Sequence, residues 1–407
     1  MADAVIIHTN RGYGYTCVGV DFSRYMYQGR KCLNLIMHFV EEHNLVLEKM
    51  GPDLDIKFLK PLRIILKIGN WELELPPLSQ NRKLTEKITK KFVHLVTGGR
   101  TECMDHWELF LKIPRPHLEG PVPDNPEDAY CLERVDFYWI YESFVVENNL
   151  PKLTLPDELN DRVNNALQRA RGERDAKLCN FYLRYEYSPP GNTRWQRNAS
   201  PIEVYLPAIR ILVDAGYQVL MTGDRDLSLE QAREFGGMLV DTALLGIEED
   251  VFNMFAGTAV DIVVNNHGGG SHLLAANKIP MLVIDAFPFW FGFRNSWMYF
   301  KTLLDDQGQP VPVEDLFSKY LFISKVKEGH LLANSAQEVA DAVTRFLKDL
   351  KTPQAFDPCE KISELIPPNT PFIWSKARFS PAWGQRYAPH LVIEENPQQL
   401  RSALINL

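Results

Sequence analysis

The stretch DIVVNNHGGGSHLLAANKIPMLVID, from Asp261 to Asp285, decides the fold that the sequence predicts. It opens on a short β-branched run, passes through three glycines and a short helical segment, and ends on a second β-branched run after Pro280. Short apolar runs bounded by turn residues are typical of buried strands. We therefore expect a strand, a glycine turn, a helix and a second strand.

The glycine turn is a candidate site for a phosphate or a diphosphate. Glycines let the backbone approach a bulky anion, and unpaired N–H groups at the start of the following helix attract negative charge. The alternative is a tight connection without a ligand. Histidine and serine side chains beside the glycines favour the anion site, because they add donors beyond a strand end, where ligands of open α/β sheets collect. The candidate binding residues are His267, Gly268, Gly269, Gly270, Ser271 and His272.

The composition predicts a well-packed protein with two domains, given 407 residues of which 45% are apolar. A net charge of −8 argues against a nucleic-acid partner, since such proteins usually carry a basic face. No apolar run approaches the roughly 20 residues that span a bilayer, and the N-terminus lacks a basic leader, so we expect a cytoplasmic protein. The six cysteines lack CxxC spacing, which favours reduced thiols over a zinc site or disulfides.

The first forty residues predict a βαβ unit, with strands from Ala4 to His8 and from Lys31 to His38. The loop between them contains Gly12 and Gly14 but has Cys17 where the dinucleotide fingerprint has its third glycine. A nicotinamide cofactor is therefore disfavoured.

Residues 41–150 carry weaker patterns. We expect strands at 62–68 and 71–75 and a basic amphipathic helix at 84–95. Lysines usually face solvent, so those of this helix are assigned to a solvated face and no site is placed there.

A second α/β unit begins near Lys177, after a proline-rich, acidic connection at 150–159 and a polar helix that ends near Arg171. Strands are expected at 179–185 and 217–222. The helix between them starts either at a capping box on Ser200 or at Pro207. Later segments add an aromatic run at 287–297, expected to fill the core or a domain interface or else to stack on a base or sugar, and a helix at 335–350 with a capping box on Ser335 and Glu338.

The fold class predicted from these patterns is α/β, with two facing Rossmann-like domains and a cleft between them. The expected boundaries are an N-terminal domain at 1–172, a C-terminal domain at 173–350, and a tail at 351–407 that packs back across the domains.

The segment GGSHLLAANKIP, from Gly269 to Pro280, resembles the GxxHxxAAxxxP stretch of bacterial heptosyltransferases. Arg184, the block RNASPIEVYLPAIRILVDAGYQVLMTGD at 197–224 and the late segment ARFSPAWGQRY at 377–387 are similar to a bacterial family of surface-polysaccharide glycosyltransferases. The likeness is good over 180–285, loose in the tail and scarce in 41–150. It implies a GT-B glycosyltransferase, whose C-terminal domain binds the nucleotide-sugar donor and whose N-terminal domain binds the acceptor.

The resemblance implies that the glycine turn holds the donor diphosphate and that Arg184 neutralises its charge, with Arg194 and Arg197 as further donor-binding cations. Helix N–H groups and an arginine fork supply fixed positive potential for a leaving nucleoside diphosphate. No metal and no cofactor are then required beyond the nucleotide sugar as co-substrate. The pair Asp224 and Asp226 is interpreted as turn-forming rather than as a DxD metal motif.

The catalytic base is less clearly marked. Heptosyltransferases have an acidic residue in the first N-terminal loop, where this chain has Tyr13 and Tyr15. No Glu-x7-Glu pair of the retaining enzymes lies near Asp285, which favours an inverting displacement with a general base. The candidates are His8, which can equally be a structural histidine, and Asp21.

Two other functions stay open: a GT-B-fold sugar-nucleotide epimerase or hydrolase, and a nucleotide- or glycan-binding module without turnover. The partners expected of a transferase are a nucleotide sugar and a glycan or lipid-linked acceptor, the latter with a peripheral contact at the inner face of the cell membrane. The oligomeric state, the sugar and the base are left open by the sequence.

Overall fold

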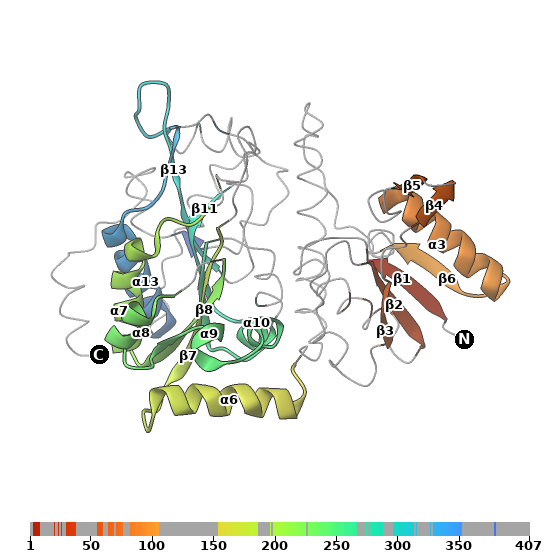
Figure 1. Cartoon of the computed structure of the whole chain (residues 1–407). Coiled ribbons are helices and arrows are strands. Elements are labelled where there is room, and N and C mark those ends of the chain that lie inside the picture. Colours follow the sequence, from red (N-terminus) through yellow and green to blue (C-terminus); the bar gives the residue numbers. More distant parts are fainter. Residues whose placement is uncertain are drawn as a thin grey trace.

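The computed structural model describes two parallel sheets with their helices (Figure 1). The described residues are 3–8, 20, 23, 26, 30–37, 55–59, 64–68, 71–75, 82–105, 154–185, 196, 198–224, 227–266, 274, 277–287, 296–312, 315, 326, 329–351 and 378–379.

The first sheet has four parallel strands in the order β3-β2-β1-β6. They are β1 (Ala4–His8), β2 (Cys32–Met37), β3 (Asp55–Leu59) and β6 (Glu102–Asp105). The two strands expected in the first forty residues are confirmed. The sequence did not predict β3 and β6, whose short, mixed patterns become strands through pairing with β2 and β1.

An antiparallel hairpin and one helix accompany this sheet. The hairpin strands are β4 (Ile64–Ile68) and β5 (Trp71–Leu75), and the helix is α3 (Arg82–Thr97). All three were expected from the sequence, with boundaries that differ by a few residues.

The second sheet has seven parallel strands in the order β15-β12-β11-β10-β7-β8-β9. They are β7 (Lys177–Leu183), β8 (Tyr217–Gly223), β9 (Leu239–Val240), β10 (Ile262–Asn265), β11 (Met281–Ala286), β12 (Ser296–Phe300) and β15 (Arg378–Phe379). An antiparallel ribbon, β13 (Thr302–Leu303) with β14 (Leu331–Leu332), adjoins it.

The order of the strands contains a topological switch point between β7 and β10. From β7 the chain moves outward through β8 to β9, and from β10 it moves the other way through β11 to β12. The connections therefore leave neighbouring strands in opposite directions, which is the topology in which ligands of open α/β sheets bind beyond the carboxyl ends of the two strands. The sheet is a doubly wound one, as the sequence predicted.

Helices cover both faces of the second sheet (Figure 1). The chain forms α6 (Asp157–Arg171), the 3₁₀ turn η3 (Ile202–Val204), α7 (Leu206–Asp214), α8 (Leu229–Glu234), α9 (Thr242–Leu245), α10 (Glu249–Thr258) and α13 (Ala336–Lys351). The pair α7 and α13 lies on one face, and α10 lies on the other. None of these helices or α3 combines the length and the apolar composition needed to cross a membrane.

The central strands are buried on both faces, because helices pack above and below them. Every residue of β10, β11 and β12 is buried. Strands of this kind have continuous apolar sequences rather than alternating ones, which is why the runs around Val263 and Val283 are recognisable without a structure. Trp297 joins β12 to α13 through an edge contact with Phe346 at 4.9 Å and a 3.1 Å hydrogen bond from its Nε1 to Asp349.

The two capping predictions have different outcomes. The backbone N–H of Ser335 donates to Glu338 at 2.7 Å and the Glu338 N–H donates to the Ser335 hydroxyl at 3.3 Å, so that capping box is confirmed. The box on Ser200 is wrong, since its N–H donates to the Tyr205 hydroxyl at 2.8 Å and α7 begins with Pro207 in its first turn. Proline suits that position because its missing N–H would have no helical partner.

The aromatic run and the tail are partly described. Phe287 and Trp297 are buried, as expected of core residues, but the sequence did not predict that the run leads into the strand β12. The tail was expected to pack back across the domains, and its described part, Arg378–Phe379, extends the second sheet by pairing with β12. The division of the chain at 172/173 stays a prediction.

Candidate functional site

The main chain of Arg184 is clamped at the switch point. Arg184 directly follows β7, and Asn266 directly follows β10, its neighbour in the sheet. The Arg184 N–H donates to the side-chain oxygen of Asn266 at 2.6 Å, and the Asn266 amide donates back to the Arg184 carbonyl at 3.2 Å. These two hydrogen bonds hold both strand ends in one register, and Asn266, which makes them, is fully buried.

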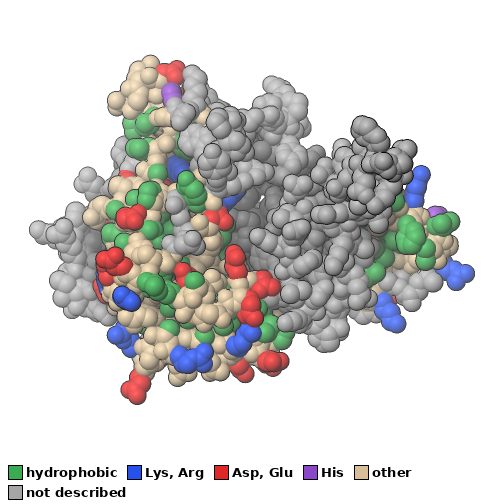
Figure 2. Space-filling model, viewed as in Figure 1, with side chains coloured by type: hydrophobic (Ala, Val, Ile, Leu, Met, Phe, Trp, Pro, Cys, Tyr) green, Lys and Arg blue, Asp and Glu red, His purple; other side chains and the backbone are tan. Residues whose placement is uncertain are grey.

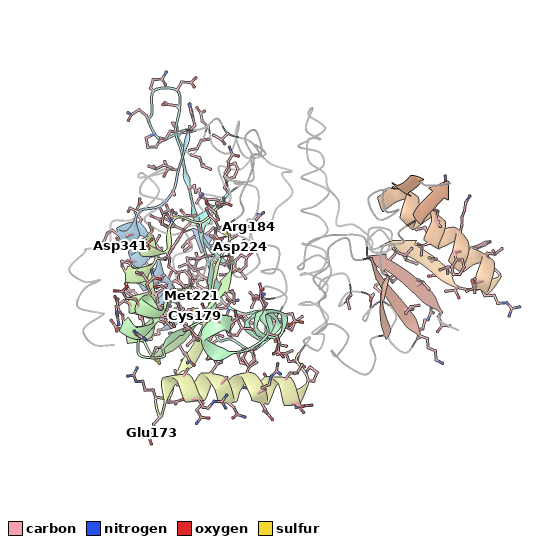
Figure 3. All side chains as sticks on the ribbon, viewed as in Figure 1. Glu173, Cys179, Arg184, Met221, Asp224 and Asp341 are labelled. Atoms are coloured by element: carbon pink, nitrogen blue, oxygen red, sulfur yellow. The ribbon has the colours of Figure 1, made fainter. Side chains whose placement is uncertain are left out.

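Two further loops hold the same segment. Ala199 N–H donates to the Arg184 carbonyl at 2.8 Å, and the next residue, Tyr185, donates its N–H to the Asp224 carboxylate at 3.0 Å. Arg184 and Asp224 lie at the same end of the sheet, away from Glu173 (Figure 3). The half-buried Arg184 side chain therefore starts from a backbone with little freedom at the carboxyl edge.

Gly223, the last residue of β8, lets the end of this strand lie very close to the end of β7. Its φ is +97°, and a Cβ atom there would lie 2.3 Å from the Leu183 carbonyl oxygen. No side chain fits that space, so the edge requires glycine at this position. The turn residue after it, Asp224, donates its N–H to the same carbonyl at 3.0 Å.

A buried carboxylate, Asp285, lies at the end of β11. Its Oδ2 accepts a 2.7 Å hydrogen bond from the Tyr205 hydroxyl, and its Oδ1 accepts from the N–H and the side-chain amide of Asn334 at 2.8 and 2.9 Å. Asp285 is fully buried and has a φ of +51°, a conformation that aspartate tolerates better than most residues. Burial and this carboxylate raise the pKa of the Tyr205 hydroxyl well above its ordinary range.

A buried lysine follows β12 at the same edge. Lys301 is 6% exposed and donates to the Asn198 carbonyl at 2.8 Å. Burial lowers the pKa of its ammonium group, and the negative charge of Asp285 partly opposes that shift. The segment 198–200 is thus tied to β7 through Ala199, to β12 through Lys301 and to α7 through the Tyr205 hydroxyl.

Of the predicted donor-binding residues, the structure describes Arg184. Arg194, Arg197 and the glycine turn with its histidines and serine, 267–272, lie outside the described residues. The turn's flanks are placed, however. Asn266 precedes it at the switch point, and Leu274 beyond it is helical, buried and bonded through its carbonyl to Ile279 N–H at 3.1 Å.

One of the two candidate bases, His8, belongs to the first sheet. His8 is the last residue of β1, which lies between β2 and β6, so its backbone is at the carboxyl edge of that sheet. The His8 side chain and the whole of Asp21 lie outside the described residues. Their catalytic role stays a prediction.

Sequence reasoning missed four residues that organise the carboxyl edge, namely Asn266, Asp285, Tyr205 and Lys301. Asp285 and Asn266 each sit where a predicted strand ends, and a polar residue closing a buried apolar run is a signal that could have found them. Lys301 likewise closes the buried run of β12, but that strand was not predicted. Tyr205 has no such signal, because it meets Asp285 through a contact between distant parts of the chain.

The chain matches no family model and no curated sequence, but it is similar to several solved structures. Among solved structures, it is similar to the ADP-heptose LPS heptosyltransferase II of E. coli, at 14% identity and a TM-score of 0.44 over 86% of this chain and 100% of that one. A family 9 glycosyl transferase from Veillonella parvula is 12% identical, with a TM-score of 0.45 over 86% and 99% of the two chains.

A third similar structure is a UDP-N-acetylglucosamine 2-epimerase from Listeria monocytogenes, described as putative. It is 12% identical, with a TM-score of 0.32 over 86% of this chain and 96% of that one. These three structures are thus two glycosyltransferases and one putative epimerase of a sugar nucleotide. At these identities and TM-scores, the likenesses say nothing of this chain's own activity.

Proposed function

We propose that the chain is a glycosyltransferase that moves a sugar from a nucleotide-diphosphate donor to a hydroxyl group of a glycan or lipid-linked acceptor. The observation that carries the proposal is the clamp of Arg184 by Asn266 at the switch point. The glycine turn begins at the residue after Asn266, so an arginine and a glycine-rich segment leave adjacent strand ends. Ligands of doubly wound sheets bind beyond such ends.

The chemistry of these groups suits a diphosphate. An arginine fork matches phosphate oxygens with two parallel hydrogen bonds, and it stays charged at every physiological pH. Backbone N–H groups of the glycine turn would add donors without a side chain in the way. We assign donor binding to Arg184, Arg194, Arg197, His267, Gly268, Gly269, Gly270, Ser271 and His272.

The reaction is proposed to be an inverting displacement without a metal. His8 or Asp21 would take the proton of the acceptor hydroxyl as general base. The acceptor oxygen then bonds to the anomeric carbon from the face opposite the nucleoside diphosphate, whose bond to that carbon breaks. The departing diphosphate carries the electron pair, and the fixed cations near the switch point stabilise its charge.

Calorimetric titration with a panel of nucleoside diphosphates tests donor binding. Arg184→Ala should weaken binding of the cognate nucleotide by about 1.5–3 kcal/mol, roughly 10- to 150-fold, the scale of a charged hydrogen bond. Arg169→Ala removes an exposed arginine on α6 and should leave affinity unchanged. Ser271→Trp should abolish binding by filling the space beside the diphosphate. Unchanged affinity in Arg184→Ala and Ser271→Trp would refute the site.

Incubation with a panel of sugar nucleotides and acceptors separates the activities. Transfer to an acceptor supports the proposal, and transfer that persists in excess EDTA supports a metal-free mechanism. An epimerised nucleotide sugar would identify an epimerase instead. Binding without turnover under every acceptor would identify a binding module.

A further inference from the structure

Helix α3 carries an exposed apolar stripe. Among the described residues, seven large apolar side chains are exposed, and four of them belong to this helix. Ile88 is 45% exposed, Phe92 63%, Leu95 79% and Val96 61%. An exposed leucine by itself needs no explanation, but a cluster of four on one helix marks a surface that another body covers.

The four side chains share one face of the helix. They are spaced at i, i+4, i+7 and i+8 from Ile88, which places them along one stripe. Lys90, Val93 and Thr97 are half-buried and occupy the opposite side of the helix. The Thr97 hydroxyl donates to the Val93 carbonyl at 2.8 Å, so its polar group is satisfied within the helix. α3 thus turns its most apolar face outward, the reverse of a helix that packs on a core.

Basic side chains border the stripe. Lys87 and Lys91 are exposed, and the helical repeat places both along one edge of the apolar face. The helix has five lysines and arginines and one acidic residue, Glu86, although the chain as a whole has a net charge of −8. Hydrophobic side chains flanked by cationic ones lie at the α3 end of the molecule in Figure 2.

We propose that α3 binds the surface of an anionic lipid bilayer. The stripe of Ile88, Phe92, Leu95 and Val96 enters the boundary between headgroups and acyl chains, and the lysines contact the phosphates. An interfacial helix has this pattern, an apolar face bordered by basic residues, and each lysine near a negatively charged leaflet adds to the attraction. The proposal is independent of the donor site, which belongs to the other sheet.

The charge of the helix favours a membrane over a second copy of the chain. In a symmetric dimer through this face, the same patch would meet itself, and the lysines of both copies would lie close together. One glutamate on each helix offers little compensation. A leaflet rich in anionic lipid buries the apolar stripe and at the same time offers negative charges to the lysines.

Flotation of the full-length protein with vesicles tests the proposal. Wild type should bind vesicles of phosphatidylglycerol and phosphatidylcholine in equal parts much better than phosphatidylcholine alone, and added salt should weaken the binding because it screens exposed charges. Phe92→Glu with Leu95→Glu should lower the partition coefficient at least tenfold, since apolar burial is lost. Lys87→Glu with Lys91→Glu should lower it at least tenfold as well.

The control is Leu229→Glu, which places one negative charge at a residue 62% exposed on α8 and should leave binding unchanged. A second readout is the variant Phe92→Trp, whose fluorescence should shift to the blue with mixed vesicles and be quenched by brominated lipid. Absence of wild-type binding to mixed vesicles would overturn the proposal, as would an equal loss in the Leu229→Glu control. A dimer in sedimentation that Phe92→Glu with Leu95→Glu dissociates would assign the face to a second copy instead.

Discussion

In the seven-stranded sheet, buried polar side chains hold both the amino edge, where the strands begin, and the carboxyl edge, where they end. The side chains at the amino edge include a neutral amide, and those at the carboxyl edge include charged groups. At the amino edge, the amide of Gln218 donates to the carbonyls of Leu167 and Gly237 at 3.1 and 2.9 Å and accepts from Arg171 at 2.9 Å. At the carboxyl edge, the fully buried carboxylate of Asp285 accepts hydrogen bonds from Tyr205 and Asn334. Its negative charge also acts on the buried ammonium group of Lys301.

This difference indicates which edge serves function. A neutral amide satisfies backbone groups at low cost, whereas buried charges must be desolvated and gain stability only when every hydrogen bond is made. Asp285 also has a left-handed backbone, and such strain collects at functional sites. At the carboxyl edge, where Arg184 emerges, a buried carboxylate and a left-handed backbone thus coincide in one residue, a combination that packing alone does not require.

The largest effect is expected from removing the buried carboxylate. Asp285→Ala removes the carboxylate that accepts from Tyr205 and Asn334 and the negative charge that acts on Lys301, so the free energy of unfolding should fall by about 3–5 kcal/mol. Asp285→Asn, which tolerates the left-handed backbone, should cost less. At the other edge, Gln218→Leu should cost about 1–3 kcal/mol. Urea unfolding measures all three, and an Asp285→Ala cost no larger than that of Gln218→Leu would contradict the distinction.

Glycines at the two edges offer a second contrast. Gly223 and Gly216 both have positive φ, at +97° and +87°, but a Cβ at Gly216 would meet open space. Gly216→Ala should therefore cost only the backbone strain, about 1 kcal/mol. Gly223→Ala adds a collision with the Leu183 carbonyl and should cost more than about 2 kcal/mol. Equal melting temperatures for the two variants would show that the carboxyl edge can relax.

A pH series tests the hydrogen bond between Tyr205 and Asp285. The pKa of the Tyr205 hydroxyl is raised in the folded protein, so its contribution is fully present below the ordinary value of 10.0 and is lost as the pH rises above it. Tyr205→Phe lacks this loss. The stability gap between wild type and Tyr205→Phe should narrow by about 1.4 kcal/mol from pH 9 to pH 11 in urea unfolding. A constant gap would mean that the folded hydroxyl ionises as freely as in the unfolded chain.

The smallest effect concerns two carboxylates that accept from the backbone at opposite ends of β7. Tyr185 N–H donates to Asp224 at 3.0 Å at the carboxyl edge, and Leu178 N–H donates to Asp261 at 2.7 Å at the amino edge. Asp224→Asn and Asp261→Asn should each cost about 1 kcal/mol of stability or less, measured by thermal unfolding. Asp224→Asn combined with Asp226→Asn should leave transfer intact. A requirement for Mn²⁺ or Mg²⁺ that this double variant removes would contradict the turn-forming interpretation of the pair.

Local patterns in the sequence predicted most of the individual elements. The continuous apolar runs of β10 and β11 and the capping box of Ser335 with Glu338 were recognisable because burial on both faces and helix capping impose their pattern on neighbouring residues. Arg184 was also selected from the sequence, and the structure places it at the switch point. The glycine turn that accompanies it rests on the sequence, outside the described residues.

The tertiary structure alone decided how these elements meet. The pairing of β12 with β15, the neighbours of β7, the partners of Asp285 and the outward apolar face of α3 all depend on residues far apart in the chain. A buried charge or an exposed leucine has the same local sequence in either environment, because burial is a property of what packs against a residue. The sequence by itself determined a doubly wound sheet with an arginine at a strand end, and long-range packing decided that Asn266 holds that arginine in place.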